Sequence, residues 1–467
     1  MANNQDGKLG LLDSSMILVG GMIGSAIFSL SGVTIGNAGP AAILSWIVAG
    51  LILLAYGLVC AELCSIYPNS GGVFMFPAKT FGKDEKSGRL WGWVTAWAYL
   101  FGCVGGLVFS SSYVATYLGI AIPALQIPGD PYMSPQPQYA LIIGVATVLI
   151  CGILNMFQIA TTGKVNTFLT ILLAVTMVLF VVIAFGATTP DGARAFNPSN
   201  FSPFFAGNQG GPGFFTAIPV AMLAYGSIVA AAFMVGEIRD PNKTIPKAMC
   251  IAMATTIALY VLVMIGTIGL ISVDMLNQTH MNYTPQFGAA WMTLGHITWL
   301  PMLVALAAVL GLLTTVLVLV ILAARTLQAA AFAGVLPESL AKNSSKGIPL
   351  LSTIIVTAVG MVFVAFPQLT NFIINFGGLS NALVVAILCY TVLVARKKNP
   401  PSAFRAPGGS LMPNLVMVVL IVCYIMGIYG DIQGGTYNIV TLIAATVGYY
   451  IVGMAIYAIG TRTTKSN

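Results

Sequence analysis

Charged side chains are scarce in this sequence. Asp, Glu, Lys and Arg make up 7% of its 467 residues, and there are two histidines. Soluble domains carry about 25% charged residues, so the chain lacks the polar surface that a water-facing globular protein needs. This scarcity excludes a soluble enzyme and a disordered scaffold. No acidic residue lies in the middle of an apolar run, which disfavours a membrane-embedded enzyme, because acid–base or metal chemistry needs such groups within reach of one another.

The cysteines do not form a recognisable site. There are seven, an odd number, and none occurs in a Cys-x-x-Cys pair. This argues against a disulfide framework and against a zinc site. Cys60 and Cys64 lie one helical turn apart and are interpreted as small buried hydrophobic residues. A Walker-type nucleotide loop is also absent, which argues against ATP-driven transport by this chain. We expect no metal and no cofactor.

Apolar residues, in contrast, are gathered into long runs. They form 58% of the sequence, and the mean hydropathy is +0.94. About 20 apolar residues in a helix cross a bilayer, and the windows predict twelve spans with no domain outside the membrane. The predicted spans are residues 14–36, 40–66, 90–123, 139–157, 165–187, 213–235, 246–272, 298–333, 349–367, 370–395, 411–430 and 436–460.

The positive charges fall between these windows in a regular way. With the N-terminus in the cytoplasm, 18 of the 19 Lys and Arg residues lie in cytoplasmic segments, and only Arg194 lies outside. Cytoplasmic loops carry such an excess. The sequence therefore predicts a multi-pass protein of the cell membrane with both termini in the cytoplasm. The net charge of +7 is spread over short loops and forms no basic face, so no nucleic acid partner is expected.

Two glycine-serine breaks interrupt the windows. They are Gly24-Ser25-Ala26 in the first window and Gly226-Ser227-Ile228 in the sixth. The two windows run in opposite directions, so the breaks lie at equivalent depths. Paired interrupted helices in the two halves of a transporter point to a binding site at the middle of the membrane. Close packing of helices through small residues is the alternative interpretation of the same glycines.

Such breaks suit a small zwitterion. The half-helix that starts at the first break presents unpaired N–H groups and the positive end of its dipole, which favour a carboxylate. Carbonyl groups freed at the breaks accept hydrogen bonds from an ammonium group, and Ser25 and Ser227 each add a hydroxyl. The main chain is therefore predicted to hold both ends of an amino acid without a charged side chain.

Several strings of the sequence resemble the signatures of one transporter family. GGMIGSAIFSLSG at 20–32, Ala61-Glu62-Leu63 with the Pro-Asn-Ser-Gly-Gly that follows at 68–72, and AYGSIVAAAFMVGEIRDPNKTIPKA at 224–248 occur in the family's order. Gly334-Val335-Leu336-Pro337 and Ile348-Pro349 continue the series. Over residues 14 to about 350, the chain resembles the amino acid–polyamine–organocation transporters.

The resemblance implies an all-α integral membrane protein of the LeuT type with discontinuous helices 1 and 6. The expected parts are an N-terminal tail (1–13), a first inverted repeat of spans 1–5 (14–187), a second of spans 6–10 (213–395), two peripheral spans (411–460) and a C-terminal tail (461–467). It also implies alternating access to a central amino acid. The residues expected to line that site are Ile23, Gly24, Ser25, Ala26, Tyr225, Gly226, Ser227 and Ile228.

The sequence departs from the family pattern at several positions. Ala26 stands in place of a third glycine, and its methyl group narrows the approach to the main chain. Ile228 replaces an aromatic lid, a role that Tyr225 or Phe28 is expected to take over. Leu173 aligns with a lysine that many proton-coupled or cation-independent relatives carry. Its absence leaves the coupling mechanism open.

Charged groups near the predicted cytoplasmic ends are candidates for a gate or for structural pairs. Glu237 and Arg239, with Arg325 or Lys243, form either a cytoplasmic gate or a solvated surface pair of little energetic weight. Glu62 is expected to pair with Lys79 or Arg89.

Two further groups of side chains lie near predicted membrane surfaces or breaks. The tryptophans Trp91, Trp93 and Trp97 are interpreted as anchors at the membrane surface. Thr314-Thr315 is a weak candidate for a cation site beside the first break.

The leading hypothesis is a secondary active transporter that exchanges small neutral amino acids by alternating access. Cationic amino acids, a proton-coupled amino acid symporter and a polyamine or organocation transporter are the alternatives. The expected partners are an amino acid or amine substrate and the lipid bilayer, and the sequence leaves the oligomeric state open. A channel would need a continuous polar pore lining, which the windows lack, and a structural subunit would bind no ligand.

Overall fold

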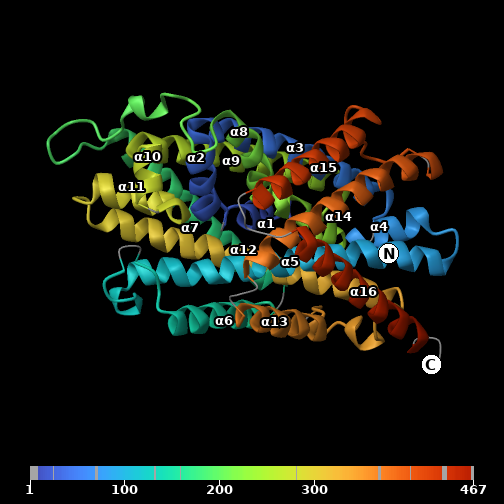
Figure 1. Ribbon diagram of the computed structural model, residues 1–467. Helices are drawn as coiled ribbons and strands as arrows, with labels where there is room; N and C mark the ends of the chain where they lie inside the picture. The colour runs from blue at the N-terminus through green and yellow to red at the C-terminus, as the bar shows by residue number, and fades with distance from the viewer. Residues whose placement is uncertain are drawn as a thin grey trace.

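The computed structural model describes residues 9–24, 26–68, 72–130, 133–157, 159–279, 281–345, 347–366, 370–399, 401–433 and 439–463. Within these ranges the chain is all-helical, and backbone pairing is limited to three isolated bridges (Figure 1). The helices are α1 (Leu11–Met22), α2 (Ser31–Ala38), α3 (Ala42–Ile66), α4 (Gly72–Phe81), α5 (Glu85–Ala121), α6 (Pro137–Leu154), α7 (Ile159–Gly186), α8 (Gly210–Leu223), α9 (Pro241–Leu270), α10 (Val273–Gln278), α11 (Pro285–Leu294), α12 (Trp299–Phe332), α13 (Leu350–Val364), α14 (Thr370–Lys398), α15 (Leu411–Gln433) and α16 (Ile439–Thr463).

The helices have the length and composition of a multi-pass membrane protein. In the described ranges, nine helical stretches are long and apolar enough to cross a membrane, with residues 11–66 counted as one. The apolar helices Leu350–Val364 and Leu411–Cys423 are shorter. Each predicted window contains helix, with ends displaced by a few residues. The count of twelve spans stays a prediction.

The two longest helices, α5 and α12, pack against each other in the middle of the bundle, and the other long helices surround them (Figure 1). α6 packs against α13 on one side of this group. α10 and α11 lie at one end of the bundle, and α4 and the last turns of α16 lie toward the other. The connections that we predict to lie on opposite sides of the membrane are therefore at opposite ends of the bundle.

The first predicted span is interrupted next to its glycine-serine break. α1 ends at Met22, Ile23 is extended (φ −76°, ψ 91°), and a π-helical turn over Ala26–Leu30 leads into α2. The sixth window is interrupted as well. α8 ends at Leu223, and a 3-10 segment over Gly226–Phe233 follows. In both cases the α-helical hydrogen bonding stops inside the apolar run.

Two tryptophans dock the last helix onto α5. Trp93 Nε1 donates to the Gly453 carbonyl (2.8 Å), and Trp97 Nε1 donates to the Tyr449 carbonyl (3.0 Å). The Trp93 side chain is 1% exposed. Trp93 is therefore not a membrane-surface anchor, because its side chain is buried and its indole N–H binds α16. The anchor role of Trp97, whose indole N–H also binds α16, stays a prediction. Trp91 is 44% exposed.

Glu62 forms a buried ion pair with a distant arginine. Both oxygens of the carboxylate accept from Arg396, at 2.7 Å from Nε and 2.6 Å from Nη2, and Oε2 also accepts from the Ala406 backbone N–H (2.8 Å). The pairing expected with Lys79 or Arg89 is wrong. Arg89 pairs with Glu85 one helical turn away, whereas Arg396 approaches Glu62 from the end of α14.

Candidate functional site

A cavity of about 140 Å³ lies where the interrupted helices meet the central bundle. Its lining comes from α1 and the turn that follows it, from α3, α5, α8, α12, α14 and α15, and from the 3-10 segment after α8. The lining residues are Gly21, Met22, Ala26, Leu30, Leu53, Tyr56, Tyr99, Gly102, Cys103, Gly105, Gly106, Phe109, Met222, Leu223, Ala224, Gly226, Ser227, Val229, Thr315, Leu319, Leu322, Asn381, Val384, Val385 and Leu420.

The two helix breaks touch at this cavity. A β-carbon placed on Gly21 would lie 2.8 Å from Cβ and 3.1 Å from Oγ of Ser227. A side chain at position 21 would therefore overlap the serine, and the lack of one lets the main chain of α1 approach the segment after α8. Both residues line the cavity. Segments more than 200 residues apart in the sequence thus form one surface.

The first break also lies against α12. A β-carbon on Gly24 would collide with the Thr315 hydroxyl and would lie 2.8 Å from the Gly311 carbonyl oxygen. Thr315 donates from Oγ1 to that carbonyl (3.1 Å). Leu173 of α7 is fully buried, and its side chain lies against Gly311 from the other direction. Gly24 therefore makes room for a tight packing of α1, α7 and α12.

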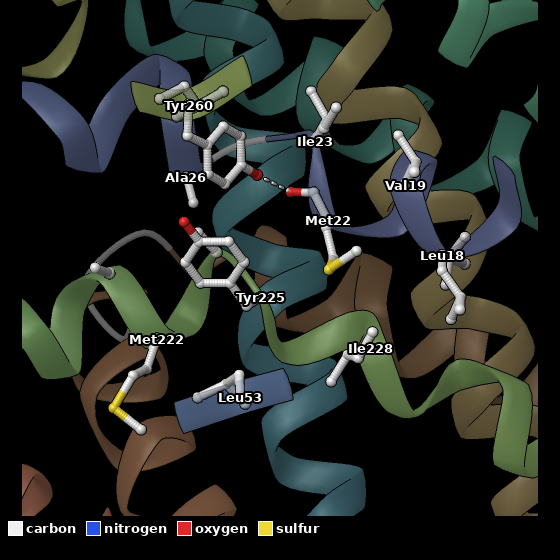
Figure 2. Close-up of a cluster of buried hydrophobic side chains, with 14 of the residues drawn as sticks. Leu18, Val19, Met22, Ile23, Ala26, Leu53, Met222, Tyr225, Ile228 and Tyr260 are labelled. Atoms are coloured by element: carbon white, nitrogen blue, oxygen red, sulfur yellow. Dashed lines mark hydrogen bonds between the residues drawn. The ribbon is translucent and has the colours of Figure 1, made fainter. Parts of the chain in front are cut away.

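Buried tyrosines satisfy main-chain carbonyls around the break. The carbonyl of Met22 has no partner within α1 because the helix ends there, and it accepts from the Tyr260 hydroxyl at 2.5 Å (Figure 2). Tyr225 lies beside Tyr260, with ring centroids 5.3 Å apart, and donates to the Trp46 carbonyl at 3.1 Å. These bonds stabilise the end of α1.

The predicted site residues fall into three groups. Ala26, Gly226 and Ser227 line the cavity. Ile23, Gly24, Tyr225 and Ile228 are buried next to it and belong to the packing that holds the breaks. Ser25 lies outside the described residues.

The predicted gate residues are dispersed. Phe28 lines a second, small cavity with Thr176 and Gln286, and the Phe28 carbonyl accepts from the Tyr117 hydroxyl (2.5 Å). Arg325 is buried in α12 and donates to Gln328 Oε1 (3.1 Å). Glu237 ends a short 3-10 turn, Val235–Glu237, and its side chain lies outside the described part of the structure. A Glu237–Arg325 gate stays a prediction.

Comparison with known proteins assigns the family. The sequence matches the amino acid permease family over residues 9–459, nearly its whole length. The chain belongs to the amino acid permease family. It is therefore an amino acid transporter of the membrane and not an enzyme.

Similar proteins are named for different substrates. The permease is 25% identical over 425 residues to the branched-chain amino acid permease BcaP of Bacillus subtilis, covering 88% of this chain and 86% of that protein. It is 24% identical to the probable threonine/serine transporter YbxG of the same organism, over 99% and 97% of the two chains. It is 27% identical to the aspartate-proton symporter of B. subtilis, over 65% of this chain and 56% of the relative.

Sequence reasoning missed the cavity residues that the permease contributes from α3, α5 and α14. Tyr56, Tyr99 and Cys103 line it, as does Asn381. The sequence does mark Asn381, because it is the one polar residue at the start of the apolar stretch Asn-Ala-Leu-Val-Val-Ala-Ile-Leu at 381–388. The sequence could not show that Asn381 lies near the breaks after α1 and α8, since that depends on how α14 packs against α5.

The lining is uncharged. Asp, Glu, Lys, Arg and His are absent from the described residues that line the cavity, and its polar side chains belong to tyrosine, serine, threonine, cysteine and asparagine. A charged substrate group in this cavity must therefore be stabilised by main-chain dipoles and uncharged hydrogen-bonding groups. Main-chain groups at helix ends provide such stabilisation for both signs of charge.

Proposed function

We propose that this permease is a secondary transporter that exchanges small neutral amino acids by alternating access at the cavity between the two helix breaks. The observation that carries the proposal is the contact of Gly21 with Ser227 at the wall of an uncharged cavity. Interrupted helices that meet in this way are the expected form of a transporter binding site.

Helix packing supports two inverted repeats of five spans. Numbering the predicted spans along the chain, helices five spans apart pack against each other: α1 against the 3-10 segment after α8, α3 against α9, α5 against α12, and α6 against α13. An in-plane two-fold axis between two repeats places equivalent helices in such pairs. Twelve spans and cytoplasmic termini complete the proposed topology.

The main chain is proposed to bind the two ends of the amino acid. The substrate carboxylate lies at Ala26, where the helical turn after the first break begins and its first N–H groups lack helical acceptors. The ammonium group lies toward the carbonyls of Leu223, the last residue of α8, and of Ala224, which caps it, and both residues line the same cavity. Ser227 lines the same cavity, and its hydroxyl is proposed to bind either end of the substrate.

Size and charge favour a short neutral substrate. A cavity of roughly 150 Å³ holds a molecule the size of benzene. The cavity of the permease, about 140 Å³, therefore suits a molecule as small as alanine or serine. Arginine is longer, and a polyamine carries several ammonium groups that would find no carboxylate among the described lining residues. We therefore favour neutral amino acids over the cationic and polyamine alternatives.

The environment of the first break favours exchange over ion coupling. Leu173 fills the space beside Gly311 with an apolar, fully buried side chain. The described cavity lining offers no carboxylate or imidazole to carry a coupling proton. Concentration gradients of the amino acids themselves are then the driving force.

Counterflow in proteoliposomes tests the proposal. Vesicles loaded with an unlabelled amino acid are expected to take up the labelled amino acid, while empty vesicles and vesicles loaded with putrescine do not. An imposed pH gradient without internal amino acid is expected to cause no accumulation. Accumulation driven by that gradient would show proton symport instead, and lack of exchange across all neutral amino acids would refute the proposed function.

A further inference from the structure

One side chain of the cavity wall offers an amide to the interior. Asn381 of α14 lines the cavity and faces Gly102 of α5. A β-carbon on Gly102 would lie 2.6 Å from Oδ1 and 2.8 Å from Nδ2 of Asn381. The glycine therefore gives the amide its place between the two helices, where any larger residue would displace it.

The Asn381 amide has no hydrogen-bond partner in the described structure. Thr315, which also lines the cavity, already donates to the Gly311 carbonyl. An amide carries two donors and one acceptor with two lone pairs. When such a group is enclosed without a partner, its desolvation penalty is not recovered. Asn381 thus brings to this wall of the cavity an amide whose donors and acceptor are not yet hydrogen-bonded.

The wall around this amide is otherwise apolar. Val384 and Val385 follow it on α14, and Leu319 and Leu420 line the cavity from α12 and α15. α14 packs against α3, α5 and α15, whereas α1 packs against α7, α9 and α12. The amide therefore comes from a different wall than the breaks that are proposed to hold the carboxylate and ammonium groups.

We propose that Asn381 is a specificity-determining residue that hydrogen-bonds the substrate's side chain, and that the substrates are neutral amino acids with a short side chain bearing a hydroxyl. A hydroxyl donates and accepts, so it matches both functions of the amide. An apolar side chain of the same shape leaves the amide unpaired. This inference rests on the proposed function, because it assigns the side-chain end of the same substrate.

Threonine and valine are the matched probes, since they have the same shape and differ by hydroxyl against methyl. We expect wild-type counterflow to prefer threonine over valine by about 10- to 100-fold, the range that corresponds to one unpaired buried polar group. In Asn381→Leu, which keeps the side-chain size, valine exchange is expected to persist and the preference to fall to about one or reverse. Gly102→Ala, which pushes the amide aside, is expected to lower the preference in the same direction.

Val385→Ala is the control. It changes the apolar wall, so the exchange rates of both probes change while their ratio stays as in wild type. An unchanged ratio in Asn381→Leu, or a wild-type preference for valine, would overturn the assignment. If Asn381→Leu loses exchange of every amino acid, Gly102→Ala decides, and an unchanged ratio there would also overturn it. Wild type that exchanges no amino acid refutes the proposed function, which is a separate outcome.

Discussion

The side chain of Ser227 occupies the space that a side chain on Gly21 would need, with 2.8 Å between its Cβ and the β-carbon position of the glycine. This contact joins the inner end of α1 to the segment after α8. Because it lies at the wall of the cavity, it determines how close the two interrupted helices come and therefore how wide the cavity is.

Gly21→Ala is expected to reduce exchange at least tenfold. The added methyl group would overlap Ser227, and overpacking of this kind costs about 1–3 kcal/mol. Removing the serine side chain in Gly21→Ala/Ser227→Gly frees the space, so the double variant is expected to recover part of the exchange activity and of the melting temperature. The two single variants and the double variant form a mutant cycle. Strictly additive effects would show that the two residues do not touch.

Glu62→Gln is expected to destabilise the protein strongly. The Glu62 side chain is 1% exposed and that of Arg396 is 10% exposed, and removal of one member of a buried pair costs about 3–5 kcal/mol because the other charge is left unpaired. Thermal unfolding in detergent measures the change. Glu62→Met/Arg396→Met is expected to be more stable than Glu62→Gln. The control is Glu338→Gln in the exposed Lys342–Glu338 pair, for which we expect a loss below about 1 kcal/mol.

Alkylation of Cys103 by N-ethylmaleimide is expected to block exchange. Cys103 lines the cavity, whereas Cys151 is buried away from its lining. Substrate at about ten times its Kd is expected to slow the inactivation roughly tenfold, because the reagent reaches only the unliganded form. Cys103→Ala is expected to abolish inactivation, and Cys151→Ala to leave it as in wild type. Inactivation that substrate does not slow would place the binding site elsewhere.

Trp93→Phe is expected to weaken the docking of α16 while exchange is retained. The indole N–H bond to Gly453 is buried, and its loss costs about 1 kcal/mol. The expected result is a lower melting temperature with unchanged selectivity. Trp91→Phe is the control, since that side chain is exposed and surface substitutions stay within about 0.5 kcal/mol. Equal effects of the two substitutions would contradict the docking role.

Properties that depend on a local stretch of sequence were predicted well. Each apolar window contains helix, and the α-helix is interrupted after Met22 and after Leu223, next to the predicted glycine-serine breaks. Local composition suffices for this, because a long apolar run favours a helix in a membrane and a cluster of glycines weakens one. Ala26, Gly226 and Ser227, chosen from these breaks, line the cavity, and their binding of a substrate stays a prediction.

Properties that depend on distant partners were not predicted. Glu62 pairs with Arg396, 334 residues away, and Asn381 reaches the cavity because α14 packs against α5. The sequence does not show which of several Lys and Arg residues lies next to Glu62. The packing of the helices determines which of them forms the ion pair.

The sequence by itself determined that this protein is a membrane-embedded bundle with two interrupted helices, since helix formation and its interruption follow from residues close together in the chain. Only the tertiary structure decided which side chains surround the cavity, because a helix presents different residues to each neighbour. The rotation and close approach of each helix are determined by interlocking side chains such as Gly21 with Ser227 and Gly102 with Asn381.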